Sequence, residues 1–375
     1  MTTTKSRLFY IGAPLDTGLP PDASVVDLLR ETGNNTGNLL IGSAIRRHLK
    51  AELVHGDLAQ DPHEIRTNFD CIVIGASNYL CRDFDFGEYA CFVEKVNLPC
   101  VMIGLGAQAP DYGCRIDVPE GTQRMVRAVS ERSASIGVRG YFSASILIEM
   151  GIKNVRVIGC PSMYWRCEPT LQFTRPKSTN GLSIGLNGSA NVVSHSANLQ
   201  AARKVEASLA RLSFERGYPY ILQNEKELME IASQPGSVYG EETIRILMEN
   251  YGLESMSPTA FVEAVKRNMT FYGDVETWLA GMQRFDFVTG SRFHGCLMGL
   301  LAGVPCQLIV HDARTREMCE LMGIPHVPLA KAPQLDVRQM YECFDSSSVS
   351  TAYRYLYQNY IDFLEENGLQ HRLRR

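Results

Sequence analysis

The sequence lacks the signals that mark membrane, secreted and nucleic-acid-binding proteins. Its 375 residues include no apolar run that approaches the roughly 18 to 20 residues needed to cross a bilayer. The opening residues, MTTTKSRLFYIGAP, have neither the basic start nor the long apolar core of a secretory signal. The net charge of −4 comes without a basic arm or a run of like charges, so no nucleic-acid partner is indicated. We therefore expect a cytoplasmic protein with no integral membrane segment.

Cofactor and metal motifs are also missing. No Walker, HExxH or GxSxG motif occurs, and GLGAQ at 104–108 lacks the third glycine of a dinucleotide-binding fingerprint. The eleven cysteines form no CxxC pair and no Cys/His cluster with zinc spacing, so we expect neither a metal nor a cofactor. Most of these cysteines lie in apolar runs, which predicts buried thiols, with a catalytic cysteine as the less favoured alternative.

What the sequence does contain is a repeated alternation of short apolar runs and segments of helical period. Four runs read as buried strands, at 70–77, 98–108, 133–140 and 154–161. Amphipathic helices are predicted between them, and Gly151 ends one of these helices. Such βαβα alternation favours a mainly parallel sheet covered by helices.

The alternation breaks at 164–181, which we interpret as a linker, and then restarts. We expect two Rossmann-like αβα domains that face a cleft, at 1–170 and 171–345. A helix in 346–375, capped by a serine at its front, would pack back on the first domain. Ligands of open parallel sheets bind beyond the carboxyl ends of the strands, so the loops after the strands are the candidate sites.

One such loop, in FDFVTGSRFHG, carries Arg292 and His294 between a strand and an apolar helix, with Gly290 and Gly295 on either side. The N–H groups at a helix start favour an anion, an arginine adds a fork of donors, and a histidine exchanges a proton near neutral pH. In an extended loop, residues i and i+2 point the same way, so both side chains would face one ligand. The alternative is that Arg292 pairs with a carboxylate and His294 hydrogen-bonds a carbonyl.

At this point the residues resemble a known family. The segment GSRFHGCLMGLLAGVPCQLIVHDARTREMCELMGIP is similar to the signature of polysaccharide pyruvyl transferases. GNNTGNLLIGSAI, LPCVMIGLGAQ and IGVRGYFSASILIEMGIKNVRVIGCPSMYW resemble further family segments in the same order, and the match spans about residues 33–327. Relatives often have an acidic residue where this chain has Asn38 and Cys160, departures that bear on the acceptor contacts.

The resemblance implies a GT-B-like fold and a transferase of polysaccharide or exopolysaccharide biosynthesis. Such an enzyme moves the pyruvyl group of phosphoenolpyruvate onto a hydroxyl pair of a sugar or glycan-lipid acceptor, forms a cyclic ketal and releases phosphate. Phosphoenolpyruvate would be a donor substrate, no cofactor would be required, and a homo-oligomer is possible. Two other functions stay open: a GT-B glycosyltransferase that uses a nucleotide sugar, and a non-catalytic sugar- or anion-binding homologue.

Within this hypothesis each candidate residue has a role. His294 donates or shuttles the proton that the methylene carbon requires, while Arg292 and the helix start hold an anionic group of the donor. Arg139 reaches the same anion from the first domain, unless it pairs with a surface carboxylate. The other candidate substrate contacts are Asn35, Gly37, Asn38, Ser291, Gly295, His311 and Arg316. The alternatives are turn formation by the Asn/Gly loop, an N-cap role for Asn38, and a solvated helix start for Arg316.

Overall fold

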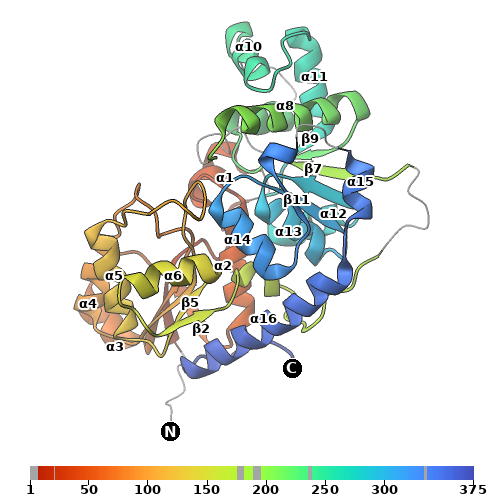
Figure 1. The fold of residues 1–375 in the computed structure, drawn as a ribbon. Coiled ribbons are helices and arrows are strands. Elements are labelled where there is room, and N and C mark those ends of the chain that lie inside the picture. The colour runs from red at the N-terminus through yellow and green to blue at the C-terminus, as the bar shows by residue number, and fades with distance from the viewer. Residues whose placement is uncertain (1–6, 21, 175–180, 189–195, 235–238, 333–335) are drawn as a thin grey trace.

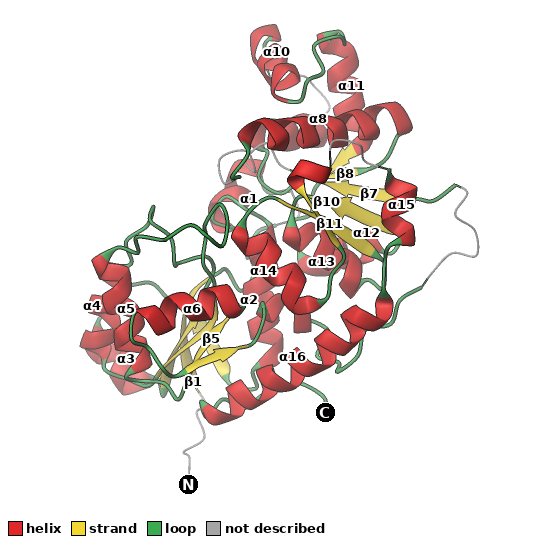
Figure 2. Cartoon of the chain, in the orientation of Figure 1, coloured by secondary structure: helices red, strands yellow, loops and turns green. Residues whose placement is uncertain are grey.

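In the computed structural model, which describes residues 7–20, 22–174, 181–188, 196–234, 239–332 and 336–375, the chain forms two six-stranded parallel sheets. Each sheet lies in its own lobe, with helices packed around it (Figure 1). Figure 2 shows the strands of each lobe enclosed by helices. The two Rossmann-like αβα units of the predicted fold class are confirmed.

The first sheet has the strand order β2-β1-β3-β4-β5-β6. Its strands are β1 (Arg7–Gly12), β2 (Glu52–His55), β3 (Cys71–Gly75), β4 (Cys100–Leu105), β5 (Ile136–Val138) and β6 (Val155–Val157). The helices of this unit are α2 (Gly37–His48), α3 (Pro62–Asn68), α4 (Gly87–Val96), α5 (Glu120–Ser130) and α6 (Tyr141–Glu149), followed by the short helix η1 (Pro161–Tyr164). The N-terminal helix α1 (Val25–Glu31) instead packs its buried residues into the core of the second unit. β3 and β4 are buried along their whole length, as continuous apolar runs predict for central parallel strands.

The second sheet has the order β12-β11-β10-β7-β8-β9. Its strands are β7 (Ile184–Asn187), β8 (Tyr220–Ile221), β9 (Met269–Thr270), β10 (Phe287–Gly290), β11 (Cys306–Val310) and β12 (His326–Pro328). Its helices are α8 (Leu199–Arg216), α9 (Lys226–Ser233), α10 (Glu241–Asn250), α11 (Pro258–Asn268), α12 (Val275–Met282), α13 (Phe293–Leu301), α14 (Ala313–Met322), η2 (Leu329–Lys331) and α15 (Val337–Glu342). The strand order reverses between β10 and β7, and ligands of open parallel sheets bind at such a switch point.

Apolar side chains join the two units as well as filling each one. One cluster of buried residues contains Leu40 of α2 together with Leu297 of α13, so helices from both halves share a core. The N-terminal loop and the second unit are also joined by a backbone hydrogen bond from Thr36 N to Gln223 O, at 3.0 Å. These contacts fix the position of the strand ends of one sheet relative to those of the other.

The last helix, α16 (Ser346–Glu366), returns from the second unit to the first (Figure 1). Tyr360 of α16 lies 3.0 Å from His48 Nδ1, and Glu366 accepts hydrogen bonds from Arg156. The N-cap of this helix is Asp345 and not a serine, because the Asp345 carboxylate accepts the hydrogen bond from Ser347 N. The predicted domain boundaries themselves stay a prediction.

Candidate active site

The Arg-x-His segment lies at the switch point of the second sheet, but its local geometry differs from the prediction. α13 already begins at Phe293, so Arg292 is its N-cap residue and His294 belongs to its first turn. The extended-loop geometry predicted for these residues is therefore wrong. The two side chains nevertheless remain electrostatic neighbours, since Arg292 contributes to lowering the pKa of His294.

Arg292 is held by acceptors of the protein itself. Its Nη2 lies 2.7 Å from Glu225 Oε1 and also donates to Asn224 Oδ1, while Nε donates to Gly188 O at 3.3 Å. The side chains of Arg292 and Glu225 are only 10% and 7% exposed. Burial raises the pKa of Glu225, but Arg292 and two backbone N–H groups lower it more, and the net pKa is lowered. The alternative stated for Arg292, an ion pair with a carboxylate, is therefore present in the structure.

His294 faces the first unit. Its Nε2 lies 3.8 Å from Cys160 Sγ, and its Nδ1 is so close to Gly37 that a methyl group there would lie 2.9 Å away. Burial lowers the pKa of His294 well below its ordinary value, and Arg139, Arg314 and Arg292 lower it further. The imidazole is therefore neutral at pH 7 in the protein alone.

Arg139 follows β5 and is only 2% exposed. Its guanidinium donates to Gly104 O at 2.9 Å, Asn78 Oδ1 at 2.9 Å and Ala76 O at 3.3 Å. Across the described parts of the chain no carboxylate oxygen lies within 4.0 Å of this guanidinium, so the alternative of a surface ion pair is wrong. The Glu317 carboxylate acts on Arg139 electrostatically from beyond hydrogen-bond distance, while it accepts hydrogen bonds from Ser143. A buried cation whose direct hydrogen-bond partners are all neutral favours an anion beside it.

The N-terminal loop of the candidate site forms a turn. Asn35 Oδ1 accepts from Gly37 N at 3.0 Å, and Asn38 Nδ2 donates to Thr32 O at 3.0 Å. α2 begins at Gly37 with Thr36 as its N-cap, so an N-cap role for Asn38 is wrong. Gly37 is the position where a side chain has no room, because a Cβ would lie 2.7 Å from Gln223 Oε1 as well as against His294. Contact of Asn35, Gly37 or Asn38 with a ligand stays a prediction.

Ser291 and Gly295 serve packing at the switch point. Ser291 is fully buried and donates to Glu206 Oε1 of α8 at 2.5 Å. A Cβ on Gly295 would lie 2.6 Å from the Asn187 side chain at the end of β7. Both residues therefore have a structural explanation, and their contact with a substrate stays a prediction.

The segment after β11 brings a different arginine to the site than predicted. Arg316 is exposed, pairs with Glu320 and Asp111, and lies over the Tyr112 ring. Arg314 is the α14 residue that acts on His294. Its Nη2 lies 3.6 Å from Asp312 Oδ2, while its Nε is buried without a hydrogen-bond partner in the described residues. The predicted role of Arg316 therefore fits Arg314 better.

His311 is buried, and its Nε2 lies 3.4 Å from Asp312 Oδ2. Its Nδ1 has no hydrogen-bond partner among the described residues. Asp312 also accepts a hydrogen bond from Gln108 Nε2 of the first unit at 2.7 Å. The Gln108 side chain in turn accepts from Asn78 Nδ2, and Asn78 Oδ1 accepts from Arg139. A polar chain thus runs across the two units from His311 to Arg139.

Besides Arg314, three members of the site were missed from the sequence: Cys160, Asn78 and Gln108. Cys160 was visible only as a departure from a family pattern, and its contact with His294 spans 134 positions. The other two lie just after β3 and β4, the strand ends where polar residues are expected to gather. That rule was the signal that could have found them.

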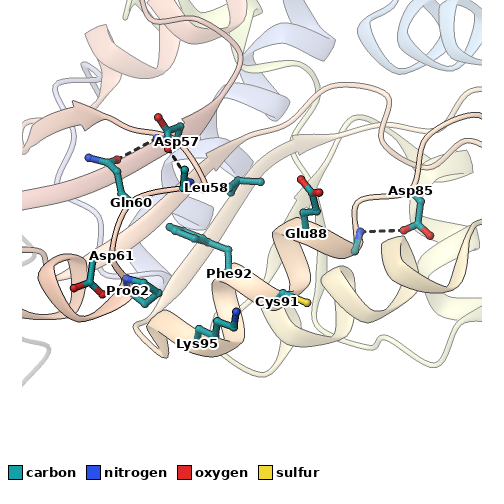
Figure 3. A pocket seen from close by; sticks show the side chains of 12 residues that line it. Asp57, Leu58, Gln60, Asp61, Pro62, Asp85, Glu88, Cys91, Phe92 and Lys95 are labelled. Atoms are coloured by element: carbon teal, nitrogen blue, oxygen red, sulfur yellow. Dashed lines mark hydrogen bonds between the residues drawn. The ribbon is translucent and has the colours of Figure 1, made fainter.

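The surface hollow on the first unit near α3 and α4 is a separate feature (Figure 3). Its acidic residues serve the local backbone: Asp57 accepts from Ala59 N, Asp61 caps α3, and Asp85 accepts from Gly87 N. The residues described above do not line it. We therefore place the candidate site at the junction of the two sheets.

Two features are absent from the described residues. These residues hold no cluster of three or more His, Cys, Asp or Glu side chains suited to a metal ion. They also include no helix with the length and apolar character of a membrane span.

Comparison with known proteins identifies a family. The profile of the family described as polysaccharide pyruvyl transferase matches residues 35–312. A search of curated proteins finds no match. Among solved structures, UDP-N-acetylglucosamine 2-epimerase from Rickettsia bellii is similar at 11% identity and a TM-score of 0.48, with 96% of each chain covered. A glycosyltransferase from Rickettsia africae is similar at 10% identity and a TM-score of 0.44, over 97% of this chain and 99% of the other.

Proposed function

Because this chain belongs to the polysaccharide pyruvyl transferase family, we propose that it transfers the pyruvyl group of phosphoenolpyruvate to two hydroxyls of a sugar acceptor, with release of phosphate. The observation that carries the proposal is Arg139, a buried guanidinium without a carboxylate partner in the described residues. It lies electrostatically close to His294, Arg314 and Cys160. Phosphoenolpyruvate has a phosphate and a carboxylate, so it supplies an anion for Arg139, whereas Arg314 already has Asp312 Oδ2 at 3.6 Å.

The reaction needs one proton on the methylene carbon of the donor and two bonds from sugar oxygens to its neighbour. His294 delivers the proton to the methylene carbon, and the first sugar hydroxyl adds to the adjacent carbon. The bond from that carbon to the phosphate oxygen then breaks, and phosphate leaves with the electron pair. The second hydroxyl closes the ketal. One hydroxyl proton returns to His294 and the other leaves with phosphate, so atoms and charge balance.

The arginines have two effects in this scheme. Without an anion, burial keeps the imidazole of His294 neutral, and Arg139 and Arg314 add to this by repelling a proton. The donor's negative charge offsets the repulsion from the arginines, so the pKa of His294 rises when donor binds. Arg292 is paired with Glu225, so it does not bind the donor alone. It lies at the start of α13 and adds to the positive electrostatic potential at His294.

The acceptor would enter from the cavity beside Gln108. This cavity of about 290 Å³ is lined by residues of both units, among them Arg82, Gln108, Arg115 and Ser196. Arg82 lies 3.3 Å from Asp83 and Arg115 lies 3.6 Å from Asp117, so the charges of the lining are paired. A lining of paired charges and amides suits the hydroxyls of a neutral sugar.

Phosphate release from phosphoenolpyruvate in the presence of a galactoside or N-acetylmannosamine acceptor tests the proposal. We expect phosphate to form only with acceptor, and the acceptor mass to grow by one pyruvate less one water. His294→Gln should abolish both signals. Release of a nucleoside diphosphate from a nucleotide sugar would favour a glycosyltransferase, and donor binding without turnover on any acceptor would favour a binding protein.

A further inference from the structure

We propose that Cys160 is a positioning residue for His294, whose thiol donates to Nε2 and thereby fixes the tautomer that presents Nδ1–H to the ligand. Cys160 follows β6 and lies directly before η1 of the first unit, whereas His294 lies on α13 of the second. The thiol is fully buried and the distance from Sγ to Nε2 is 3.8 Å. The contact therefore crosses the junction between the two units.

A second contact sets the direction of this hydrogen bond. The hydroxyl of Ser162, also fully buried, donates to Cys160 Sγ with an oxygen–sulfur distance of 2.8 Å. The sulfur thus already accepts a hydrogen bond, which leaves its own S–H as the donor. Its other contact within the described parts of the chain is His294 Nε2, which is the acceptor in the proposed arrangement.

The tautomer follows from counting protons. A neutral imidazole carries one N–H, and the nitrogen that accepts from the thiol is not the one that carries it. The proton therefore lies on Nδ1, the nitrogen that faces Gly37. Nδ1 has no protein hydrogen-bond partner among the described residues, so its proton is the one left to donate to a ligand. His48 holds the opposite tautomer, because its Nε2 lies 2.8 Å from Tyr164 O and must donate to it.

The thiol also bears on the charge of the ring. The charged and titratable groups that act on His294 are Arg139, Arg314 and Arg292, together with Cys160 in contact. A carboxylate at the position of Cys160 would add a negative charge that opposes the arginines. Cys160→Asp should consequently allow His294 to hold a second proton at a higher pH than in the natural protein.

The first test is NMR of the full chain with ¹⁵N-labelled histidine, in which the His294 signals are assigned by their loss in His294→Gln. We expect His294 as the Nδ1–H tautomer at pH 7 and His48 as the Nε2–H tautomer in the same spectrum. Cys160→Ala should move His294 toward Nε2–H without changing His48, and Cys160→Ser should keep Nδ1–H. An Nε2–H form in the natural protein, or an unchanged tautomer in Cys160→Ala, would overturn the inference.

The second test is kinetic and rests on the proposed function. In Cys160→Ala we expect kcat for phosphate release to fall about ten- to a hundredfold with little change in KM, below the ~10²- to 10⁴-fold that a positioned acid supplies. Cys160→Ser should recover part of this loss, and Cys160→Asp should move the pH optimum upward. Unchanged kcat in Cys160→Ala would refute the positioning role. If the natural protein shows no turnover, the proposed function fails while the NMR result still decides the tautomer.

Discussion

Replacement of Arg139 by glutamine separates the binding of an anion from the stability of the fold. The change removes a buried positive charge, whose desolvation costs several kcal/mol. It also weakens three hydrogen bonds to neutral acceptors, each of which contributes about 1 kcal/mol or somewhat more for a charged donor. These effects oppose each other, so we expect the free energy of unfolding to change by no more than about 2 kcal/mol.

The effect on ligand binding should be much larger. If phosphoenolpyruvate binds the natural protein, a concentration of 100 Kd adds about 2.7 kcal/mol to its stability. For a chain of this length that raises the melting temperature by about 3 °C. The Arg139→Gln variant should show almost no shift at the same concentration, because the anion loses its buried cation.

Thermal unfolding with and without phosphoenolpyruvate measures both quantities in one experiment. Arg132→Gln is the matched control: this arginine is in the same unit, is 19% exposed, and donates to Ala128 O and Asn97 Oδ1. The control should keep the full ligand-induced shift. An undiminished shift in Arg139→Gln, or a loss of stability far above 2 kcal/mol without ligand, would show that Arg139 is a structural residue.

Three further outcomes are expected. Gly37→Ala should lower turnover strongly but stability little, because the atoms that a methyl group would meet are the ends of movable side chains. The control Gly113→Ala, at a position with open space, should change neither turnover nor stability. Equal turnover in the two variants would refute the steric conflict at Gly37. Glu225→Ala should cost about 3–5 kcal/mol of unfolding free energy in denaturant titrations because it leaves Arg292 buried without its carboxylate, and a cost under 1 kcal/mol would contradict this. Burial lowers the pKa of His48 to about 3, so the unfolded chain takes up the proton first as pH falls below about 6.5. Stability should then decrease by about 1.4 kcal/mol per pH unit down to about pH 3, with a flatter profile in His48→Gln.

Much of the fold could be predicted because it follows from local patterns. Continuous apolar runs correctly predicted the central strands β3 and β4, and helical periodicity correctly predicted α5 and α6. Short strands such as β2 and β12 were missed, since their exposed or partly buried residues carry no apolar run. The start of α13 was also misplaced by a loop prediction, and this changed how Arg292 and His294 lie.

The residue types of the candidate site were readable from the sequence, but their partners were not. An arginine at a strand end is equally compatible with an ion pair and with an anion site. Arg292 forms an ion pair with Glu225, which is 67 positions away, and Arg139 donates hydrogen bonds to neutral acceptors. Sequence spacing carries no information about such contacts, because they depend on how the strand ends of two sheets meet.

By itself, the sequence determined the alternation of strands and helices, the glycine-flanked Arg-x-His turn and the family. Each of these is a local pattern of side chains along the chain. The tertiary structure alone decided which arginine is left without a carboxylate, and that Cys160 meets His294 across the junction of the units. Those relations arise because helices from both units share one core, and packing of that core sets which distant side chains come within bonding distance.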